Sequence, residues 1–290
     1  MEKIDIHCHT TRRPLPDTAC PDASLDAIAA RMREHEIVHT LVYASYFPHR
    51  GSGISNFRLR HWIEERRTKE LLEHTYNEGG RNEFGLVGSL DVGTYFKQGM
   101  SEFEELAEMR ALHGIKLYTG YQEVDLAGPK VDAIAQLARD SRVPVLLHTG
   151  YSYSAMRSTG NPAYTTLVTP MTVAKLAARH PENEFVLCHL GKPFFDETIA
   201  ALRETRNVWT DTSGLLDSKY ETDEISRCIA ELRRVVEHAG VERVLFGSDF
   251  PVETHAHAIK IVDAALSGFS EEERQRVYYR NAMRLFGGRT

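Results

Sequence analysis

Residues 3–10 read KIDIHCHT, a short apolar run that ends in two histidines separated by one residue, His7 and His9. On a β-strand, the side chains of residues i and i+2 point to the same side, so both imidazoles can face one point and hold one metal ion. A doubly wound dinucleotide-binding sheet would place a glycine-rich phosphate loop directly after its first strand. HCHT stands there instead, and this stretch therefore favours a different α/β architecture.

Seven further apolar runs follow along the chain, and helical patterns fill the gaps between the runs. Several runs carry β-branched or continuous apolar residues, which is typical of strands that are buried on both faces. The eight expected strands are Lys3–His7, Val38–Ala44, Phe84–Leu90, Gly114–Tyr118, Pro144–His148, Glu184–His189, Asn207–Asp211 and Arg243–Gly247. Eight strands separated by helices in a chain of 290 residues predict a (β/α)8 TIM barrel.

Two of the predicted helices carry recognisable start signals. Ser24 precedes an amphipathic stretch that runs to Glu36, and Ser101 with Glu104 forms a capping-box pattern for a helix to Leu112. The other expected helices are His61–Glu73, Pro129–Ser141, Thr169–Arg179, Phe194–Glu204, Thr222–Ala239 and His255–Leu266. The chain has no internal repeat or clear linker, so residues 1–290 are expected to form a single domain.

Composition and charge narrow the class of protein. Charged residues make up 26% of the chain, and 35 basic against 41 acidic residues give a net charge of −6. This balance is ordinary for a globular protein and predicts no basic face for nucleic acid. The four cysteines form no CxxC pair, no apolar run reaches the length of a membrane span, and the N-terminus lacks a signal-peptide core. We therefore expect a cytoplasmic protein that contacts neither nucleic acid nor membrane.

Ionisable side chains terminate the predicted strands at the end where a barrel of this kind has its active site. They are His7, His9, Lys116, His148, His189 and Asp249. Each has an ordinary alternative: a lone histidine is more often structural, Lys116 suits a surface salt bridge, and Asp249 suits a helix N-cap. Their joint occurrence is harder to explain in this way, because burying them unpaired costs on the order of several kcal/mol. A metal ion would offset that cost, whereas the other ten histidines, including His255 at an expected helix start, need no special chemistry.

These segments together resemble the metal-dependent amidohydrolase superfamily, most closely its amidohydrolase-2 (amidohydrolase-related) branch. IDIHCH, GIKLY, LLHTG, CHLG and FGSDFP match the motifs of that branch for strands 1, 4, 5, 6 and 8, in order. NVWTDTSG resembles its seventh-strand segment and RNAMRLFG its C-terminal helix, so the resemblance covers essentially the whole chain. It implies a distorted (β/α)8 barrel with a metal site at the C-terminal ends of the strands.

The resemblance also implies which residues bind metal. His7, His9 and Asp249 would hold a divalent ion, joined by His148 in the one-metal members of the branch, where the strand 6 histidine, here His189, acts as a catalytic acid or base. In two-metal members, a carboxylated lysine from strand 4, here Lys116, bridges the ions, and the strand 5 and strand 6 histidines bind the second ion. Both arrangements stay open at this point. Zn²⁺ suits imidazole and carboxylate ligands, and Mn²⁺ is its competitor.

Metal-assisted hydrolysis is the chemistry expected of such a site. A divalent ion lowers the pKa of its water toward roughly 7 and polarises a carbonyl group. Asp249 would take the proton and deliver it to the leaving group, and His189 would bind the second metal or hold the developing oxyanion. The expected substrate is a small molecule with an amide, cyclic amide or lactone bond.

Two other functions remain as alternatives. Several members of the branch are non-oxidative decarboxylases of aromatic or unsaturated carboxylic acids. Lys116 favours hydrolysis over that reaction, because decarboxylase members generally lack the strand 4 lysine. A barrel that only binds its ligand is the third reading, and it predicts a missing metal ligand, whereas the sequence has all of them.

Substrate-binding residues are expected in the loops that follow the strands. Arg157 and Lys192 suit a substrate carboxylate or another anion, and Tyr118 and Tyr151 follow strands 4 and 5. Each of the four is individually consistent with an ordinary loop residue. Asp211, at the end of strand 7, is expected to orient a ligand histidine by accepting its other N–H. Homo-oligomers are common among enzymes of this type, and the sequence itself shows no interface.

Overall fold

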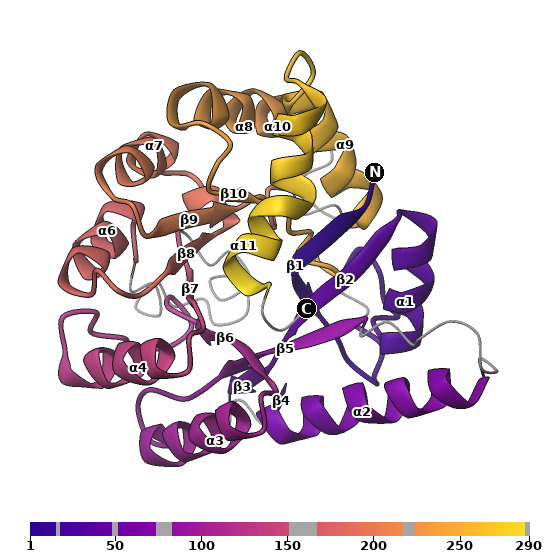
Figure 1. Ribbon diagram of the computed structural model, residues 1–290, viewed down its shortest axis with the longest axis vertical. Coiled ribbons are helices and arrows are strands. Elements are labelled where there is room, and N and C mark those ends of the chain that lie inside the picture. The colour runs from indigo at the N-terminus through magenta and orange to yellow at the C-terminus, as the bar shows by residue number, and fades with distance from the viewer. Residues whose placement is uncertain (16–17, 48–51, 74–82, 151–166, 217–223, 288–290) are drawn as a thin grey trace.

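Eight parallel strands form a barrel in the computed structural model, which describes residues 1–15, 18–47, 52–73, 83–150, 167–216 and 224–287. The strands are β1 (Lys3–His9), β2 (Ile37–Tyr43), β5 (Phe84–Ser89), β6 (Leu112–Leu117), β7 (Val145–His148), β8 (Phe185–Cys188), β9 (Val208–Asp211) and β10 (Val244–Leu245). They pair in parallel in this order, and the helices lie outside the ring of strands (Figure 1). The predicted TIM barrel is therefore confirmed.

The barrel closes between β10 and β1 through a few backbone hydrogen bonds. The N–H of Asp249 donates to the carbonyl of His7 over 2.8 Å. The N–H of His9 donates to the carbonyl of Phe250 over 2.7 Å. Because β10 ends at Leu245, the chain after it is free to form a turn that lies against the end of β1. This irregular join is the distortion of the barrel, and it brings Asp249 to the two histidines.

The helices match the sequence pattern in most places. They are α1 (Leu25–Glu34), α2 (Asn56–Glu73), α3 (Phe96–Glu108), α4 (Pro129–Asp140), α6 (Pro170–Arg179), α7 (Phe195–Glu204), α8 (Ile225–Ala239), α9 (His255–Ala265), α10 (Glu271–Gln275) and α11 (Asn281–Phe286). The chain also forms the short helical turns η3 (His189–Gly191) and η5 (Arg276–Arg280) and a small hairpin of β3 (Ser45–Phe47) and β4 (Ser52–Ile54). Ser24 caps α1, as predicted. The predicted start at Ser101 is wrong, because the apolar stripe of α3 already begins at Phe96 and leaves Ser101 inside the helix.

Apolar side chains form two layers, one inside the barrel and one between the strands and the helices. The inner layer contains Ile4, Ile6, Leu41, Val87, Leu146, Val186, Trp209 and Leu245, together with Ala282 and Phe286 of α11. Asn281 of α11 donates to the carbonyls of Val241 and Val244, where β10 begins. Helix α11 therefore closes the end of the barrel at which the strands start (Figure 1), and the polar residues gather at the other end.

An irregularity in β1 decides where its histidines point. Ile6 belongs to the inner layer, so strict alternation along the strand would turn His7 and His9 outward. The pairing register with β2 shifts between Asp5 and Cys8. Beyond this shift Cys8 packs in the outer layer, and the two histidines face the barrel mouth. Local bulges of this kind re-aim side chains and are frequent beside active sites.

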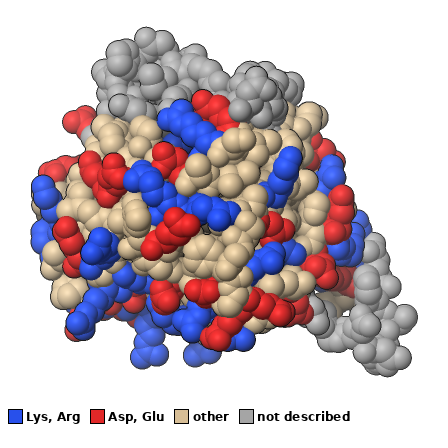
Figure 2. Space-filling view, turned by 90° about the horizontal axis from the view of Figure 1, so that it is seen from above, with Lys and Arg blue, Asp and Glu red and all other residues tan. Residues whose placement is uncertain are grey.

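The surface carries charges of both signs. Figure 2 shows basic and acidic side chains interspersed over the described part of one face, without a broad area of either sign. Among the described residues, no helix combines the length and the apolar composition needed to cross a membrane.

Candidate metal-binding active site

The carboxylate of Asp249 lies between the two histidines of β1. Its Oδ1 atom is 3.2 Å from His9 Nε2 and 3.5 Å from His7 Nε2. His7 is fully buried and Asp249 is 8% exposed, so the three groups meet at the inner wall of the barrel mouth. The HxH spacing predicts that His7 and His9 share one face of β1, and both of them meet the aspartate that follows β10.

The backbone at Asp249 has an unusual conformation. Its φ of 60° lies in the left-handed region, which aspartate tolerates better than most residues and which often marks functional positions. Asp249 does not cap α9, because Thr254 does so by accepting from the N–H of His257 over 3.1 Å. The turn around Asp249 therefore serves to aim its side chain.

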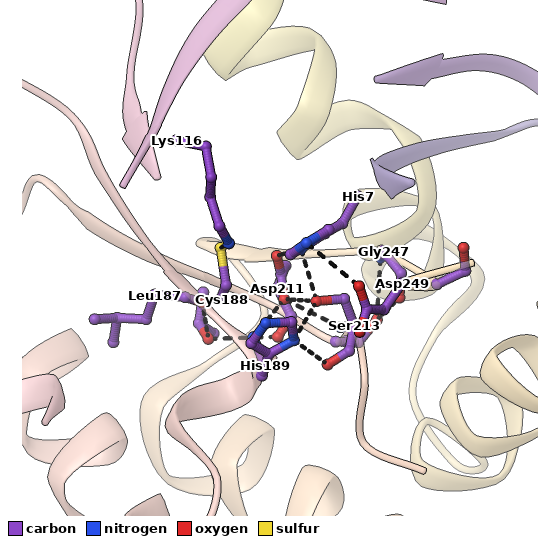
Figure 3. Close-up of polar contacts among 12 residues, drawn as sticks. His7, Lys116, Leu187, Cys188, His189, Asp211, Ser213, Gly247 and Asp249 are labelled. Carbon is purple, nitrogen blue, oxygen red and sulfur yellow. Dashed lines mark hydrogen bonds and ion pairs between the residues drawn. The ribbon is translucent and has the colours of Figure 1, made fainter. Parts of the chain in front are cut away.

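Asp211 at the end of β9 fixes the orientation of His7. Its Oδ2 lies 2.8 Å from His7 Nδ1, and its Oδ1 accepts from the hydroxyl of Ser213 over 2.6 Å and from the N–H of His189 over 2.8 Å (Figure 3). A carboxylate only accepts hydrogen bonds, so the proton of neutral His7 resides on Nδ1 and its Nε2 keeps a free lone pair. Asp211 therefore accepts the other N–H of one of the histidines predicted to bind metal, and its role in orienting a ligand stays a prediction.

The donor atoms around Asp249 fit a cation. His7 Nε2 is buried and makes no hydrogen bond within the described part of the chain, and it faces a carboxylate oxygen that also carries lone pairs. Burial, and then the positive charge of Lys116, hold the pKa of His7 well below its ordinary value, so a proton does not fill this gap near neutral pH. One donor atom each of His7, His9 and Asp249 lies within 4.8 Å of the others. Two imidazoles and a carboxylate are a typical donor set for Zn²⁺.

His148 and His189, at the ends of β7 and β8, complete a group of four histidines. The ring of His189 lies 4.6 Å from that of His148 and 4.9 Å from that of His7, measured between centroids. His189 Nδ1 lies 3.2 Å from the carbonyl of Ser213, which places the proton on Nδ1 and the lone pair on Nε2. Burial, followed by His148 and His7, lowers the pKa of His189. A neutral His189 can therefore accept a proton or bind a metal ion.

Gly214 allows the segment after β9 to pass directly beneath these groups. A Cβ atom at this position would lie 2.7 Å from His189 Nδ1 and 2.8 Å from Asp249 Oδ2. The backbone φ of 60° is also one that glycine adopts without strain. The glycine of the TDTSG segment is thus explained by the close approach of backbone and site.

Lys116 points into the barrel beside this group, with its amine on a thiol. The side chain is fully buried, and Nζ donates to Cys188 Sγ over 2.8 Å (Figure 3). The same Nζ lies 5.3 Å and 5.5 Å from the ring centroids of Tyr43 and Tyr118, at cation–π distance.

The structure describes two of the four residues that are expected to contact substrate, Tyr118 and Lys192. Tyr118 is buried, its hydroxyl donates to the carbonyl of Ala44 over 3.0 Å, and burial raises its pKa. Lys192 Nζ donates to the carbonyl of Leu215 over 2.9 Å. Arg157 and Tyr151 lie outside the residues that the structure describes.

Two residues of the site escaped the sequence reasoning. The ring of Tyr43, the last residue of β2, stacks on His7 at 4.2 Å between centroids and an angle of 18°. Its position at a strand end was the available signal. The second is Asp5, whose carboxylate bonds to the backbone of His7 at 3.0 Å. Asp5 lies on the side of β1 opposite to the histidines and contacts backbone groups, so the pattern of candidate ligand side chains gave no reason to include it.

The family model described as amidohydrolase (Amidohydro_2) matches residues 4–288 of this chain. The match covers every strand and helix of the barrel, from the first residues of β1 to the end of α11. It extends over the segments that carry the histidines and aspartates described above.

Solved structures with the same fold include three informative relatives. An amidohydrolase from Burkholderia multivorans with bound zinc has 19% identity and a TM-score of 0.67, with 99% of both chains covered. A probable 2-pyrone-4,6-dicarboxylic acid hydrolase from Acinetobacter baumannii with citric acid bound has 17% identity and a TM-score of 0.66, covering 99% of this chain and 100% of that one. The 5-carboxyvanillate decarboxylase of Sphingomonas paucimobilis has 16% identity and a TM-score of 0.61, with 99% of both chains covered. At identities this low, the likeness shows a shared fold and nothing about activity.

Proposed function

Because this chain belongs to the Amidohydro_2 family of amidohydrolases, we propose that it is a metal-dependent hydrolase that cleaves an amide, cyclic amide or lactone bond of a small molecule. One observation carries the proposal: Asp249 Oδ1 lies within 3.5 Å of both His7 Nε2 and His9 Nε2. His7 Nε2 and Asp249 Oδ1 both carry lone pairs, and a buried site that points lone pairs at one another is suited to a cation.

His7, His9 and Asp249 would hold the ion, with His148 as a further ligand. A divalent ion there supplies a water of lowered pKa and a Lewis acid for a carbonyl oxygen. Zinc is our first choice because of the histidine and carboxylate donors, and the zinc-bound structure of the Burkholderia multivorans relative supports it. Manganese is the competitor to test.

The side chains of the chain itself perform the proton transfers. Asp249 accepts the proton of the attacking water and returns it to the leaving group, a double role open to a carboxylate at the edge of the site. His189 Nε2 faces the site with a lone pair and can hold or move a second proton. Asp211 and Ser213 keep His7 and His189 in the required tautomers throughout.

The position of Lys116 supports a site with one ion. A bridging carboxylated lysine needs its Nζ free to carry the carboxyl group, whereas here Nζ rests on Cys188 Sγ at 2.8 Å. His189 is then available as an acid or base, which the one-metal arrangement requires. Carboxylation of Lys116 stays a separate proposal that a metal count tests.

The proposed substrate carries a carboxylate or another anionic group. One relative supports this on two counts, since it is described as a probable dicarboxylic acid hydrolase and its structure holds citric acid. Lys192, Arg157, Tyr118 and Tyr151 are our candidates for contacts to the anion. The positive side chains would neutralise it, and the tyrosines would provide hydroxyl donors, for which Tyr118 would first turn its O–H away from the carbonyl of Ala44.

Non-oxidative decarboxylation of an aromatic or unsaturated acid is the second candidate function. The contact between Lys116 and Cys188 favours it. The presence of Lys116 supported hydrolysis only as a bridge between two metal ions, and a lysine bound to a thiol does not serve as that bridge. The fold likeness to the 5-carboxyvanillate decarboxylase is compatible with it as well.

A substrate panel separates the two functions. The purified protein, loaded with zinc or manganese, is incubated with lactones and cyclic amides that bear carboxylates and with hydroxybenzoic acids, and both acid release and carbon dioxide release are measured. Hydrolysis predicts ring opening with metal-dependent uptake of base. Carbon dioxide release from the aromatic acids, without ring opening of any lactone or amide, contradicts the hydrolase.

A further inference from the structure

Asp5 lies on the outer side of β1, yet it contacts both segments that carry the proposed metal ligands. The side chain is fully buried. Its Oδ1 accepts from the N–H of His7 and from the N–H of Ser248, each over 3.0 Å, and its Oδ2 accepts from the hydroxyl of Ser248 over 2.5 Å. One carboxylate therefore ties the first strand to the residue that precedes Asp249.

We propose that Asp5 is a positioning residue that holds His7, His9 and Asp249 at ligand distance from outside the barrel. The expected effect of Asp5 on metal affinity rests on the proposed function. Its effect on the positions of His7 and Asp249 rests on its own contacts. Its hydrogen bonds go to the backbone N–H groups of His7 and Ser248 and to the hydroxyl of Ser248, so Asp5 acts through these groups and through no proposed ligand atom.

The first contact stabilises the irregularity in β1. The register with β2 runs through Asp5 and resumes at Cys8, so His7 lies where the ladder is interrupted. A buried N–H without a partner is costly, and Asp5 Oδ1 supplies the acceptor for His7. This bond therefore favours the backbone shift that turns His7 and His9 into the barrel.

The second set of contacts stabilises the turn at Asp249. Ser248 donates to Asp5 from both its N–H and its hydroxyl, and the same hydroxyl accepts from the N–H of Phe250 over 3.1 Å. Asp249 is thus held from both neighbours in a conformation with φ of 60°. The N–H of Asp249 completes the link by donating to the carbonyl of His7 over 2.8 Å.

His255 of α9 lies beside this network on the side away from the site, and its ring nitrogens make no hydrogen bond within the described part of the chain. Its Nε2 lies 3.3 Å from Asp5 Oδ2, and both side chains are buried. Asp5, Cys8 and His255 also form a group of potential metal ligands. We assign the group to positioning, because Asp5 already accepts three hydrogen bonds that an ion would have to displace or share.

The test compares Asp5→Asn and Ser248→Ala with a matched control. Asn281→Ala serves as the control, since Asn281 is also buried and its side chain makes two backbone hydrogen bonds of 2.7 and 2.8 Å at the opposite end of the barrel. Zinc affinity is measured by competition with a chelator, the ring nitrogen shifts of His7 are measured by NMR in the metal-free protein, and thermal unfolding is followed for each variant.

We expect Asp5→Asn to lower zinc affinity by about 10- to 100-fold, the range for residues that orient ligands, and to shift the His7 ring signals. Ser248→Ala removes the hydroxyl's bonds to Asp5 and Phe250 but leaves both backbone N–H bonds to Asp5 in place. It should therefore lose less zinc affinity, and it covers the case in which the Asp5 variant does not fold. The control should lose thermal stability while zinc affinity and His7 signals stay unchanged.

Unchanged His7 signals and zinc affinity in both variants would overturn the inference, as would an equal loss in Asn281→Ala. Absence of zinc and manganese binding by the unaltered protein would instead overturn the proposed function. The His7 signals of the metal-free variants still decide the role of Asp5 in that case, so the two failures are distinguishable.

Discussion

Asp249 and His7 are joined through the backbone, and their side chains meet at the proposed metal site. The N–H of Asp249 donates to the carbonyl of His7 over 2.8 Å, and Asp249 Oδ1 lies 3.5 Å from His7 Nε2. The backbone bond sets the distance at which the side chains meet, so the ligand geometry is present before any ion binds. A site organised in this way avoids reordering its ligands upon metal binding.

Asp249→Asn should abolish turnover while the fold is retained. The amide has the shape of the carboxylate but cannot accept the proton of water, and the loss of a general base costs about 100-fold or more. Turnover and circular dichroism are measured side by side. Asp263→Asn, at a half-exposed carboxylate of α9, is the matched control and should stay active. Near-normal turnover in Asp249→Asn contradicts the proposed mechanism.

Asp211→Asn should weaken metal binding more than Ser213→Ala does. Asp211 accepts from His7 Nδ1 over 2.8 Å, and an amide in its place can present an N–H that forces the wrong tautomer on the imidazole. We expect a loss of about 10- to 100-fold in metal affinity for Asp211→Asn. Ser213→Ala leaves the bond between Asp211 and His7 in place and should lose less. Equal affinities for both variants and the parent chain, measured by titration, would remove Asp211 from the site.

Glu253→Gln should stabilise the protein at neutral pH. Burial raises the pKa of Glu253 well above its ordinary value of 4.5, so the folded state retains a proton that the unfolded state has released. Stability therefore falls as pH rises above about 4.5, which is the sign for a raised carboxyl pKa. Glutamine removes this dependence and keeps an acceptor for the N–H of Leu216.

The measurement is the melting temperature of the metal-free protein over a range of pH. The advantage of Glu253→Gln should be a few degrees at neutral pH and should vanish toward mildly acidic pH. Glu237→Gln, at an exposed position of α8, is the control and should follow the parent curve. A Glu253→Gln variant that melts lower than the parent at neutral pH would show that the ionised form has a partner.

Lys116→Met should leave the metal content of the protein at one ion per chain. The amine of Lys116 contacts Cys188 and two tyrosine rings, and the first ion is assigned to His7, His9 and Asp249. Metal is measured by elemental analysis after loading in the presence of labelled bicarbonate. A parent chain that holds two ions, loses one in Lys116→Met and carries a labelled carbamate would instead establish the bridged arrangement.

Much of the site was accessible from the sequence because a parallel barrel places all its strand ends together. Once eight strands were assigned, His7, His148, His189 and Asp249 had to meet at one end, and the structure brings them together. The helix at Ser101 was misplaced for a local reason: a capping box is a short pattern, and the apolar stripe that starts at Phe96 outweighs it.

Tyr43 and Cys188 belong to the part that spacing did not predict. Both are apolar or weakly polar residues at strand ends, and their relevance depends on which side chain they meet across the barrel. Tyr43 meets the ring of His7, and Cys188 meets the amine of Lys116. Such contacts join strands that are distant in sequence, and no local pattern records them.

The sequence by itself determined the barrel and the shared direction of His7 and His9, because the strand count and the two-residue period are local properties. Only the tertiary structure decided that this direction is inward. Ile6 faces the inner layer, and alternation alone would have sent both histidines outward. The register shift between Asp5 and Cys8 reverses the outcome, and it depends on hydrogen bonds from His7 and Ser248 to a carboxylate on the far side of the strand. A bond between residues separated by most of the chain can form only after the barrel has closed.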